Sequence, residues 1–216
     1  MQPQRRFDTG WRERLTLTDG TEVELRLLQP QDAELLRQGF ERLSMRSRIG
    51  RFHVAKPRLS DHEVQYLTQV DGEQHLALGA VRWGPQGEEE GLGIARFIRL
   101  AQDAELAEAA ITVVDPAQGK GLGRVLLERL VEAARERGVD RFEFRILPGN
   151  VAMLRLLEEH TSDNPPEVDE DSLCITVPLA ATPRRKWNLL LLLLSLAARG
   201  AQSMLGSETP APPDER

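Results

Sequence analysis

The chain has 216 residues, a formal net charge of −6 and 40% hydrophobic residues. This length predicts one substantial core of about 170 residues, with roughly 40 residues left for the ends. The acidic balance, without a basic stripe or an aromatic platform, excludes nucleic acid as the main partner. The single cysteine, Cys174, excludes an internal disulfide and a cysteine-rich zinc site, and it predicts a cytoplasmic protein.

Four segments follow from the composition. We expect an N-terminal tail over 1–12, one domain over 13–180, a basic and leucine-rich helix over 181–206, and a disordered tail over 207–216. The first residues are polar and include two arginines, so no apolar segment there predicts export.

The first half of the domain alternates between strand and helix patterns. An alternating run ends at Pro30, an amphipathic helix follows it, and Ser60 or Asp61 supplies the cap of a second, short helix. The predicted elements are a strand over 21–30, helices over 31–43 and 59–67, and a hairpin formed by 75–83 and 92–100 across the loop 84–91.

The second half continues the alternation and completes a mixed sheet. A long helix places six apolar side chains on one face before Gly138 ends it. The predicted elements are strands over 106–114, 141–147 and 172–179, and helices over 121–138 and 150–160. The pattern predicts a single α/β (α+β) domain in which helices flank the sheet.

The loop between strand 106–114 and the following helix carries three glycines in five residues. Glycine lets the backbone approach an anion closely and adopt positive φ, and the helix N-terminus directs N–H groups at the same point. A Walker-type loop is excluded because Lys120 is followed by Gly121, and the glycine spacing excludes a Rossmann fingerprint. The alternative is a glycine-rich turn without a ligand. The predicted anion-binding residues are Gln118, Gly119, Lys120, Gly121, Leu122, Gly123 and Arg124.

Gln118, Gly121 and Gly123 match the signature Gln/Arg-x-x-Gly-x-Gly/Ala after a strand. In this signature the chain resembles the GNAT family of acyl-CoA-dependent N-acyltransferases, and the similarity extends over roughly residues 15–179. Residues 42–81 and 142–160 resemble the Pat-type protein lysine acetyltransferases, a branch of that family. The resemblance implies a GNAT-like, largely antiparallel mixed sheet.

The resemblance also implies acetyl-CoA as cosubstrate, with no metal. The loop would hold the pyrophosphate, and the strand before it would bind the pantetheine arm through Ile111, Thr112 and Val113. Asn150 is implied as a further contact to the arm, and it is also placed to cap the helix that follows it.

Glu108 is the candidate general base, because an ammonium must lose a proton before its nitrogen attacks a thioester. Pat-type enzymes carry their catalytic glutamate in an Ala-Glu pair at this place, and Ala107-Glu108 matches that pair. Flanking alanines are also expected to desolvate Glu108 partly if it faces the cleft. The alternative is a solvated glutamate at the start of a strand.

Other residues of the site are assigned from the same resemblance. The oxyanion donor is a backbone N–H of Thr112 or Val113. The family's usual tyrosine acid falls on Leu157, and the chain's one tyrosine is Tyr66, so the general acid is unassigned.

Several residues are interpreted as structural. We expect His75 at a sheet edge, Cys174 as a packed thiol, no metal site among the histidines, and a short or missing sixth strand around 160–171.

The segment 184–198 combines basic residues, Trp187 and a run of leucines. Its apolar part is too short to span a bilayer. Packing on the domain or on a second copy is favoured over an interfacial membrane anchor, which stays the alternative.

Together these patterns predict an acetyl-CoA-dependent N-acetyltransferase with a protein lysine as acceptor. One alternative is a small-molecule amine acceptor, and another is a non-catalytic acyl-CoA sensor or scaffold. The acidic residues around Glu89 and Glu105 are consistent with a solvated surface or with attraction of a cationic acceptor.

Overall fold

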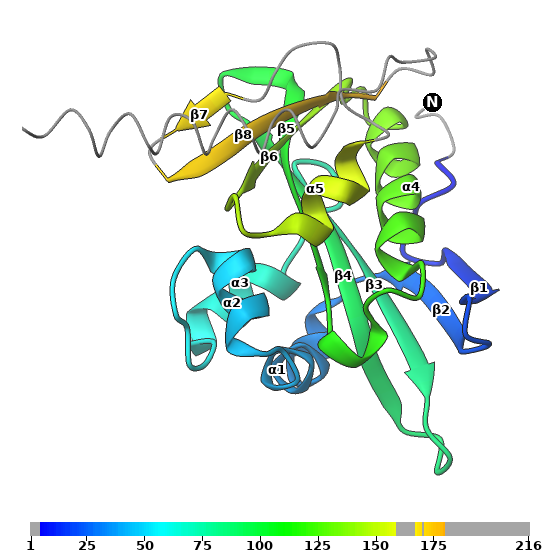
Figure 1. The fold of residues 1–216 in the computed structure, drawn as a ribbon. Helices are drawn as coiled ribbons and strands as arrows, with labels where there is room; N and C mark the ends of the chain where they lie inside the picture. The colour runs from blue at the N-terminus through cyan, green and yellow to red at the C-terminus, as the bar shows by residue number, and fades with distance from the viewer. Residues whose placement is uncertain (1–4, 159–166, 170, 180–216) are drawn as a thin grey trace, which may run out of the picture.

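A computed structural model describes residues 5–158, 167–169 and 171–179 (Figure 1). The segments 181–206 and 207–216 lie outside the described residues, so the packing and anchoring interpretations of 184–198 stay predictions. Within the described ranges, no helix is long and apolar enough to cross a membrane.

The described residues form an eight-stranded sheet in the order β1-β2-β3-β4-β5-β6-β8-β7. Its neighbouring strands are antiparallel except for β5 and β6, which are parallel. The strands are β1 Arg12–Thr16, β2 Glu22–Leu27, β3 His75–Trp83, β4 Glu89–Leu100, β5 Asp103–Val113, β6 Arg141–Ile146, β7 Glu167–Asp169 and β8 Ser172–Pro178. The expected short sixth strand is the three-residue β7, which pairs with β8 at the edge of the sheet.

Helices cover the two faces of the sheet (Figure 1). They are α1 Ala33–Glu41, α2 Met45–Phe52, α3 Asp61–Thr68, α4 Leu122–Arg135 and α5 Val151–Glu158, with 3-10 turns η1 Pro30–Asp32 and η2 Asp115–Ala117. The first three lie together on one side. On the other side α4 buries its apolar face against β4, where a Cβ added to Gly93 would lie 3.1 Å from Leu126 Cδ1.

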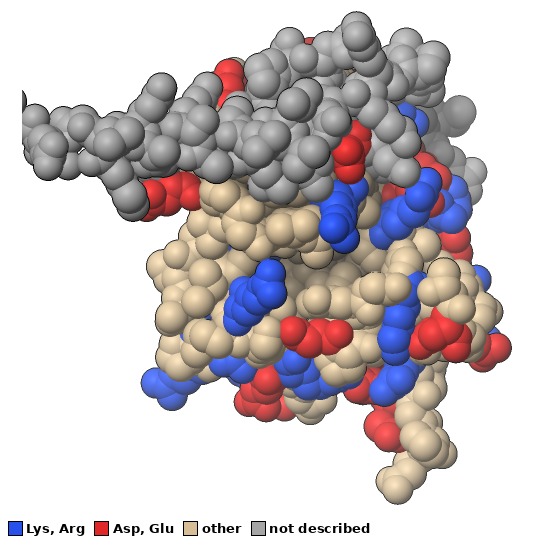
Figure 2. All heavy atoms as spheres, in the orientation of Figure 1, with Lys and Arg blue, Asp and Glu red and all other residues tan. Residues whose placement is uncertain are grey.

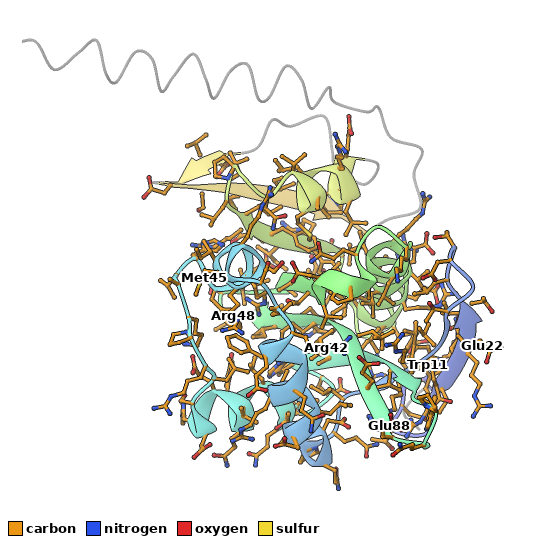
Figure 3. All side chains as sticks on the ribbon, turned by 60° about the horizontal axis from the view of Figure 1, so that its bottom comes forward. Trp11, Glu22, Arg42, Met45, Arg48 and Glu88 are labelled. Carbon is orange, nitrogen blue, oxygen red and sulfur yellow. The ribbon has the colours of Figure 1, made fainter. Side chains whose placement is uncertain are left out.

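The N-terminal residues pack more tightly than the sequence predicts. We expected a tail over 1–12, but Phe7 is only 1% exposed and its ring lies 4.6 Å from that of Trp11, which is also buried. Arg137 donates to the carbonyl of Phe7 at 2.7 Å, and Glu136 accepts from its N–H at 3.2 Å. The tail interpretation is therefore wrong for this part of the chain, because its two aromatic rings complete the core (Figure 3 labels Trp11).

Helix α2 was not predicted from the sequence, and neither was β1. Three of the eight residues of α2 are arginines, so its periodicity is weak. The Ser44 hydroxyl caps it by accepting from the N–H of Ser47 at 3.2 Å. Met45 and Arg48 lie on this helix in Figure 3. The omission matters because the C-terminal end of α2 lines the cleft described below.

A buried ion pair fixes the start of α1 on the sheet. Arg26 of β2 donates to both carboxylate oxygens of Asp32, at 2.7 and 2.6 Å, and both residues are buried. Asp32 also accepts from the N–H of Gln29, and Arg26 reaches Glu89 at 3.0 Å. The hydrogen bond to Asp32 raises the pKa of Arg26, so its guanidinium stays charged in this environment.

Asp32→Asn should lower the free energy of unfolding by about 3 kcal/mol, because it leaves a buried guanidinium without its bidentate partner. Urea denaturation measures this change. The matched control is Asp61→Asn, since Asp61 pairs with Arg37 at the surface and should have little effect. Equal losses in the two variants would contradict a special role for the buried pair.

Candidate active site

The site begins where β5 and β6 separate. The two strands pair in parallel over three positions, from Leu106 with Arg141 to Glu108 with Glu143. Strand β5 then continues to Val113, while β6 ends at Ile146. A gap therefore opens between neighbouring strands just after Glu108.

The backbone of β5 faces this gap at alternate residues. The N–H of Val114 donates to the carbonyl of Leu92 on β4, which pairs with β5 on the side away from the gap. Because the backbone groups of successive residues in a strand point to alternate sides, those of Thr112 also point toward β4. Ile111 and Val113 then direct their N–H and C=O groups into the gap. Of the two expected oxyanion donors, Thr112 and Val113, this geometry favours Val113.

The glycine loop closes one end of the gap. Gly119 and Gly121 have φ of +73° and +88°, a backbone conformation that residues with side chains rarely adopt. Gly121 is the N-cap of α4, and no side chain caps this end of the helix. The first N–H groups of α4, including those of Leu122 and Gly123, lack intrahelical acceptors, as in any α-helix. The loop thus combines close backbone approach with a helix N-terminus, which is the arrangement that binds a phosphate.

Two basic side chains predicted for the loop are engaged elsewhere in the fold. Lys120 pairs with Asp19 of the β1–β2 turn at 2.8 Å, and the hydrogen bond from Lys120 holds the pKa of that carboxyl well below its usual range. Arg124 pairs with Glu128 at 3.1 Å, one turn further along α4. The cradle therefore consists mainly of backbone groups.

Gln118 and Asp115 tie the loop to α2. The side-chain amide of Gln118 donates to Val113 O at 3.0 Å and to Ser47 Oγ at 3.3 Å. Asp115 accepts from the N–H of Ser44 at 2.9 Å and from the hydroxyls of Ser44 and Ser47 at 2.7 and 3.1 Å. Partial burial opposes ionisation of Asp115, but these hydrogen bonds prevail and keep its pKa below the ordinary value.

Glu108 lies in a cleft of about 300 Å³ that is open to solvent. Figure 2 shows this face hollowed near its centre, with basic and acidic side chains around the hollow. The expectation that flanking alanines desolvate Glu108 is wrong. Glu108 is exposed, because Ala107 and Ala109 point to the opposite, buried face of the sheet. The cleft is lined by residues 50–53 of α2 and its end, 108–111 of β5, 144–146 of β6, and Asn150 and Met153.

Asn150 caps α5, as predicted, by accepting from the N–H of Met153 at 3.2 Å. Its amide also faces α2, where a Cβ added to Gly50 would lie 3.3 Å from Asn150 Nδ2. The cap thus lies between the two sides of the cleft. Leu157, the position at which the family usually has its tyrosine acid, is fully buried and offers no proton donor.

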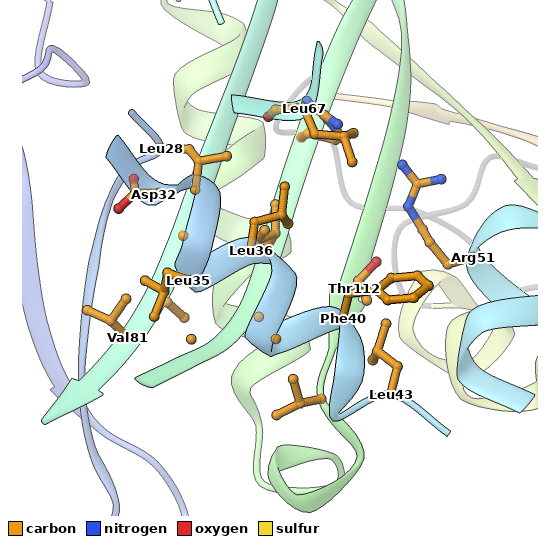
Figure 4. A pocket seen from close by; sticks show the side chains of 18 of the residues that line it. Leu28, Asp32, Leu35, Leu36, Phe40, Leu43, Arg51, Leu67, Val81 and Thr112 are labelled. Carbon is orange, nitrogen blue, oxygen red and sulfur yellow. Dashed lines mark hydrogen bonds between the residues drawn. The ribbon is translucent and has the colours of Figure 1, made fainter. Parts of the chain in front are cut away.

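A second hollow lies under α1 and shares Arg51 and Phe52 with the cleft. Figure 4 shows Leu35, Leu36 and Phe40 of α1 over the strands, with Arg51 and Thr112 beside Phe40. Arg51 lines both the cleft and this apolar pocket. Arg51 was not predicted from the sequence, because the spacing of Met45, Ile49 and Phe52 at i, i+4 and i+7 is only a weak helix signal among three arginines.

The floor of this pocket holds a buried basic pair. His75 is buried on β3, which runs between β2 and β4, so its expected place at a sheet edge is wrong. Arg96 of β4 is 5% exposed and contacts the His75 ring nitrogen and the Leu67 carbonyl. Burial, together with the positive charge of Arg96, lowers the pKa of His75 to about 4, so His75 accepts from Arg96 at neutral pH. Tyr66 lies above both, with its ring 5.4 Å from that of His75.

Cys174 behaves as a structural thiol. It lies on β8 opposite the buried face formed by Leu173 and Ile175, and burial raises its pKa to about 11. A reactive cysteine requires a lowered pKa. Among the described residues, no group of His, Cys, Asp or Glu side chains is arranged to hold a metal ion.

Comparison with known protein families identifies this fold. A family model described as an acetyltransferase (GNAT) domain matches residues 22–160. This range is more than half of the chain, so the chain belongs to the GNAT acetyltransferase domain family. The predicted family and mixed-sheet fold are confirmed.

Individual relatives agree with this assignment. Acetyltransferase Pat of Mycolicibacterium smegmatis is 34% identical over 142 residues, and acetyltransferase PA5475 of Pseudomonas aeruginosa is 34% identical over 127 residues. The matches cover 62% and 57% of this chain, but only 39% and 65% of those proteins.

Solved structures share the fold. The GNAT domain of S. lividans PAT has a TM-score of 0.71 at 29% identity and covers 80% of this chain and 99% of that chain. An acetyltransferase-like protein of Salmonella typhimurium, yncA, solved with its cofactor acetyl-CoA, has a TM-score of 0.55 at 21% identity, over 74% of this chain and 97% of that chain.

The depressed pKa of His75 predicts a pH dependence of stability. The unfolded state binds a proton on His75 below about pH 6.5, but the folded state binds it only near pH 4, so stability is full above pH 6.5 and falls as the pH approaches 4. Chemical denaturation from pH 7 to 4 should show a shallower loss in His75→Gln. The control is His62→Gln, which removes an exposed histidine on α3. Parallel profiles for the wild type and His75→Gln would contradict the prediction.

Proposed function

We propose that this protein transfers the acetyl group of acetyl-CoA to an amine, that the amine is a protein lysine, and that Glu108 is the general base. The observation that carries the proposal is the position of Glu108 at the point where β5 and β6 separate, inside a cleft that extends along β5 to Ile111. Membership in the acetyltransferase family supplies the reaction class.

The residues present fit the cosubstrate. The positive φ of Gly119 and Gly121 and the uncapped start of α4 suit a pyrophosphate, and the gap-facing backbone of Ile111 and Val113 suits an amide-bearing arm. Asn150 lies at the far side of the same cleft. When bound, acetyl-CoA supplies the activated thioester carbonyl.

Each group of the site has a role in the proposed reaction. Glu108 takes the proton of the acceptor ammonium, directly or through water, so that the amine nitrogen can attack the carbonyl carbon. The N–H of Val113 stabilises the oxyanion of the tetrahedral intermediate. The carbon–sulfur bond breaks as the amide forms, the attacking nitrogen releases its second proton to water, and the leaving thiolate takes up a proton from water, since Leu157 provides none. Exposure of Glu108 keeps it in contact with solvent, to which it returns the proton.

The proposal of a lysine acceptor rests on the resemblance of residues 42–81 and 142–160 to Pat-type enzymes and on the similarity to proteins named Pat.

A small-molecule amine is the second candidate. The observation that favours it is the pocket under α1, which is mostly apolar and shares Arg51 with the cleft. Acetylation assays with lysine peptides and small amines side by side distinguish the two.

Gly121→Glu should weaken binding of acetyl-CoA by about 100-fold, because it places a carboxylate and a strained backbone in the pyrophosphate cradle. Calorimetric titration measures the effect. Gly87→Glu is a matched control, since Gly87 has φ of +82° and open surroundings in the β3–β4 turn, away from the loop. Equal affinities in a folded Gly121→Glu variant would show that the loop does not hold the cosubstrate.

Glu108→Gln should lower turnover about tenfold or more, because it removes the proton acceptor but keeps the size of the side chain. Affinity for acetyl-CoA should stay unchanged. Glu105→Gln is the control, because Glu105 is an exposed carboxylate on the same strand and points to the other side of the sheet. Full activity of Glu108→Gln would remove Glu108 from the mechanism.

A further inference from the structure

The pocket under α1 contains two arginines that lack acidic partners. Among the described residues, no carboxylate pairs with Arg51 or Arg96, whereas Arg26 in the same pocket has both Asp32 and Glu89. The guanidinium of Arg51 makes no hydrogen bond within the described part of the chain and lies 5.1 Å from the centre of the Phe52 ring. Arg96 is 5% exposed, and its Nε is a buried side-chain atom without a hydrogen-bond partner there.

This arrangement is costly for the protein alone. A buried charge is stable only when it is paired and hydrogen-bonded, and the two guanidiniums repel each other. Burial lowers the pKa of Arg51 against the opposing effect of Glu108, and burial together with the charge of Arg51 lowers the pKa of Arg96 to about 10. The neutral His75 offers Arg96 a lone pair but no negative charge. An anion at this point would supply what both guanidiniums lack.

Arg96 and Arg51 both lie near Glu108. On the sheet, Glu108 lies opposite Ile98, and Arg96 lies two residues further along β4 on the same face. Such diagonal neighbours are roughly 7 Å apart. Arg51 borders both hollows, and Glu108 acts on its charge. An acceptor that presents an amine to Glu108 therefore carries its next few atoms past Arg51 toward Arg96.

We propose that Arg51 and Arg96 form a subsite that binds a carboxylate of the acceptor molecule, next to the amine that is acetylated. The inference rests on the proposed acetyl transfer and narrows its acceptor. Apolar side chains such as Leu36, Phe40 and Phe52 surround the subsite and would contact the body of the acceptor. The carboxylate belongs either to a free amino acid or to an acidic residue beside a target lysine, and the substrates tested separate these sources.

Turnover gives the first test. Acceptors are compared in matched pairs, each free amino acid with its amide, and each lysine peptide carrying a neighbouring glutamate with the same peptide carrying glutamine. In the wild type, kcat/KM should favour the carboxylate member by about tenfold in at least one series. Arg51→Gln and Arg96→Gln should each abolish this preference through KM, so that the ratio of kcat/KM for the carboxylate and amide members of a pair, measured within one variant, falls to about one.

Controls distinguish a lost subsite from a damaged fold. Arg58→Gln removes one exposed positive charge outside the pocket and should keep the preference. Arg96→Lys should restore part of it. If Arg96→Gln does not fold, Arg51→Gln remains informative, because Arg51 holds no described hydrogen bond that folding requires.

A binding measurement separates this inference from the proposed catalysis. In Glu108→Gln saturated with CoA, the melting midpoint should rise with the preferred carboxylate acceptor more than with its amide, and Arg51→Gln should remove the difference. A preference that persists while Glu108→Gln is fully active would overturn the base and not the subsite. Two results would overturn the subsite. One is a wild type whose kcat/KM and melting midpoint are the same with the carboxylate acceptor and with its amide. The other is a preference for the carboxylate that is unchanged in both arginine variants.

Discussion

The separation of β5 from β6 is the constraint on which the site depends. Two parallel strands that pair over three residues and then diverge leave backbone groups without ladder partners, and such groups must be satisfied by water or by a ligand. The same divergence brings Glu108 to the apex of the gap and leaves room for α2 on one side and the Asn150 turn on the other. The unpaired backbone groups, the position of Glu108 and the cleft therefore follow from one local feature of the sheet.

The pocket under α1 contains charged side chains in two contrasting environments. Arg26 and Asp32 form a fully hydrogen-bonded pair that fixes the helix to β2. A short distance along the same pocket, Arg51 and Arg96 have no such counterpart among the described residues. A stabilising role is enough to explain the first pair. It does not explain the second, whose uncompensated charge is the kind of local conflict that proteins keep at functional sites.

Most strands and helices were predictable from the sequence, because the patterns that predict them are local. The period-two strands, the helix after the glycine loop and the signature of Gln118, Gly121 and Gly123 all lie within short windows. The environment of Glu108 was not predictable, because the solvation of a strand residue depends on which face turns to the cleft. Arg96 was missed for a similar reason: an arginine in a strand is ordinarily read as solvent-facing, and only the helices packed above it make this one buried. The arginine-rich α2 lacked a clear pattern of its own.

The hydrogen bonds that join Gln118 and Asp115 to Ser44 and Ser47 connect the glycine loop with the first turn of α2. One end of this helix is thus held by the glycine loop, while the other end carries Arg51 to the border of the pocket under α1. A molecule bound at the loop and a molecule bound in the pocket would therefore both act on α2, so that this helix links the two places.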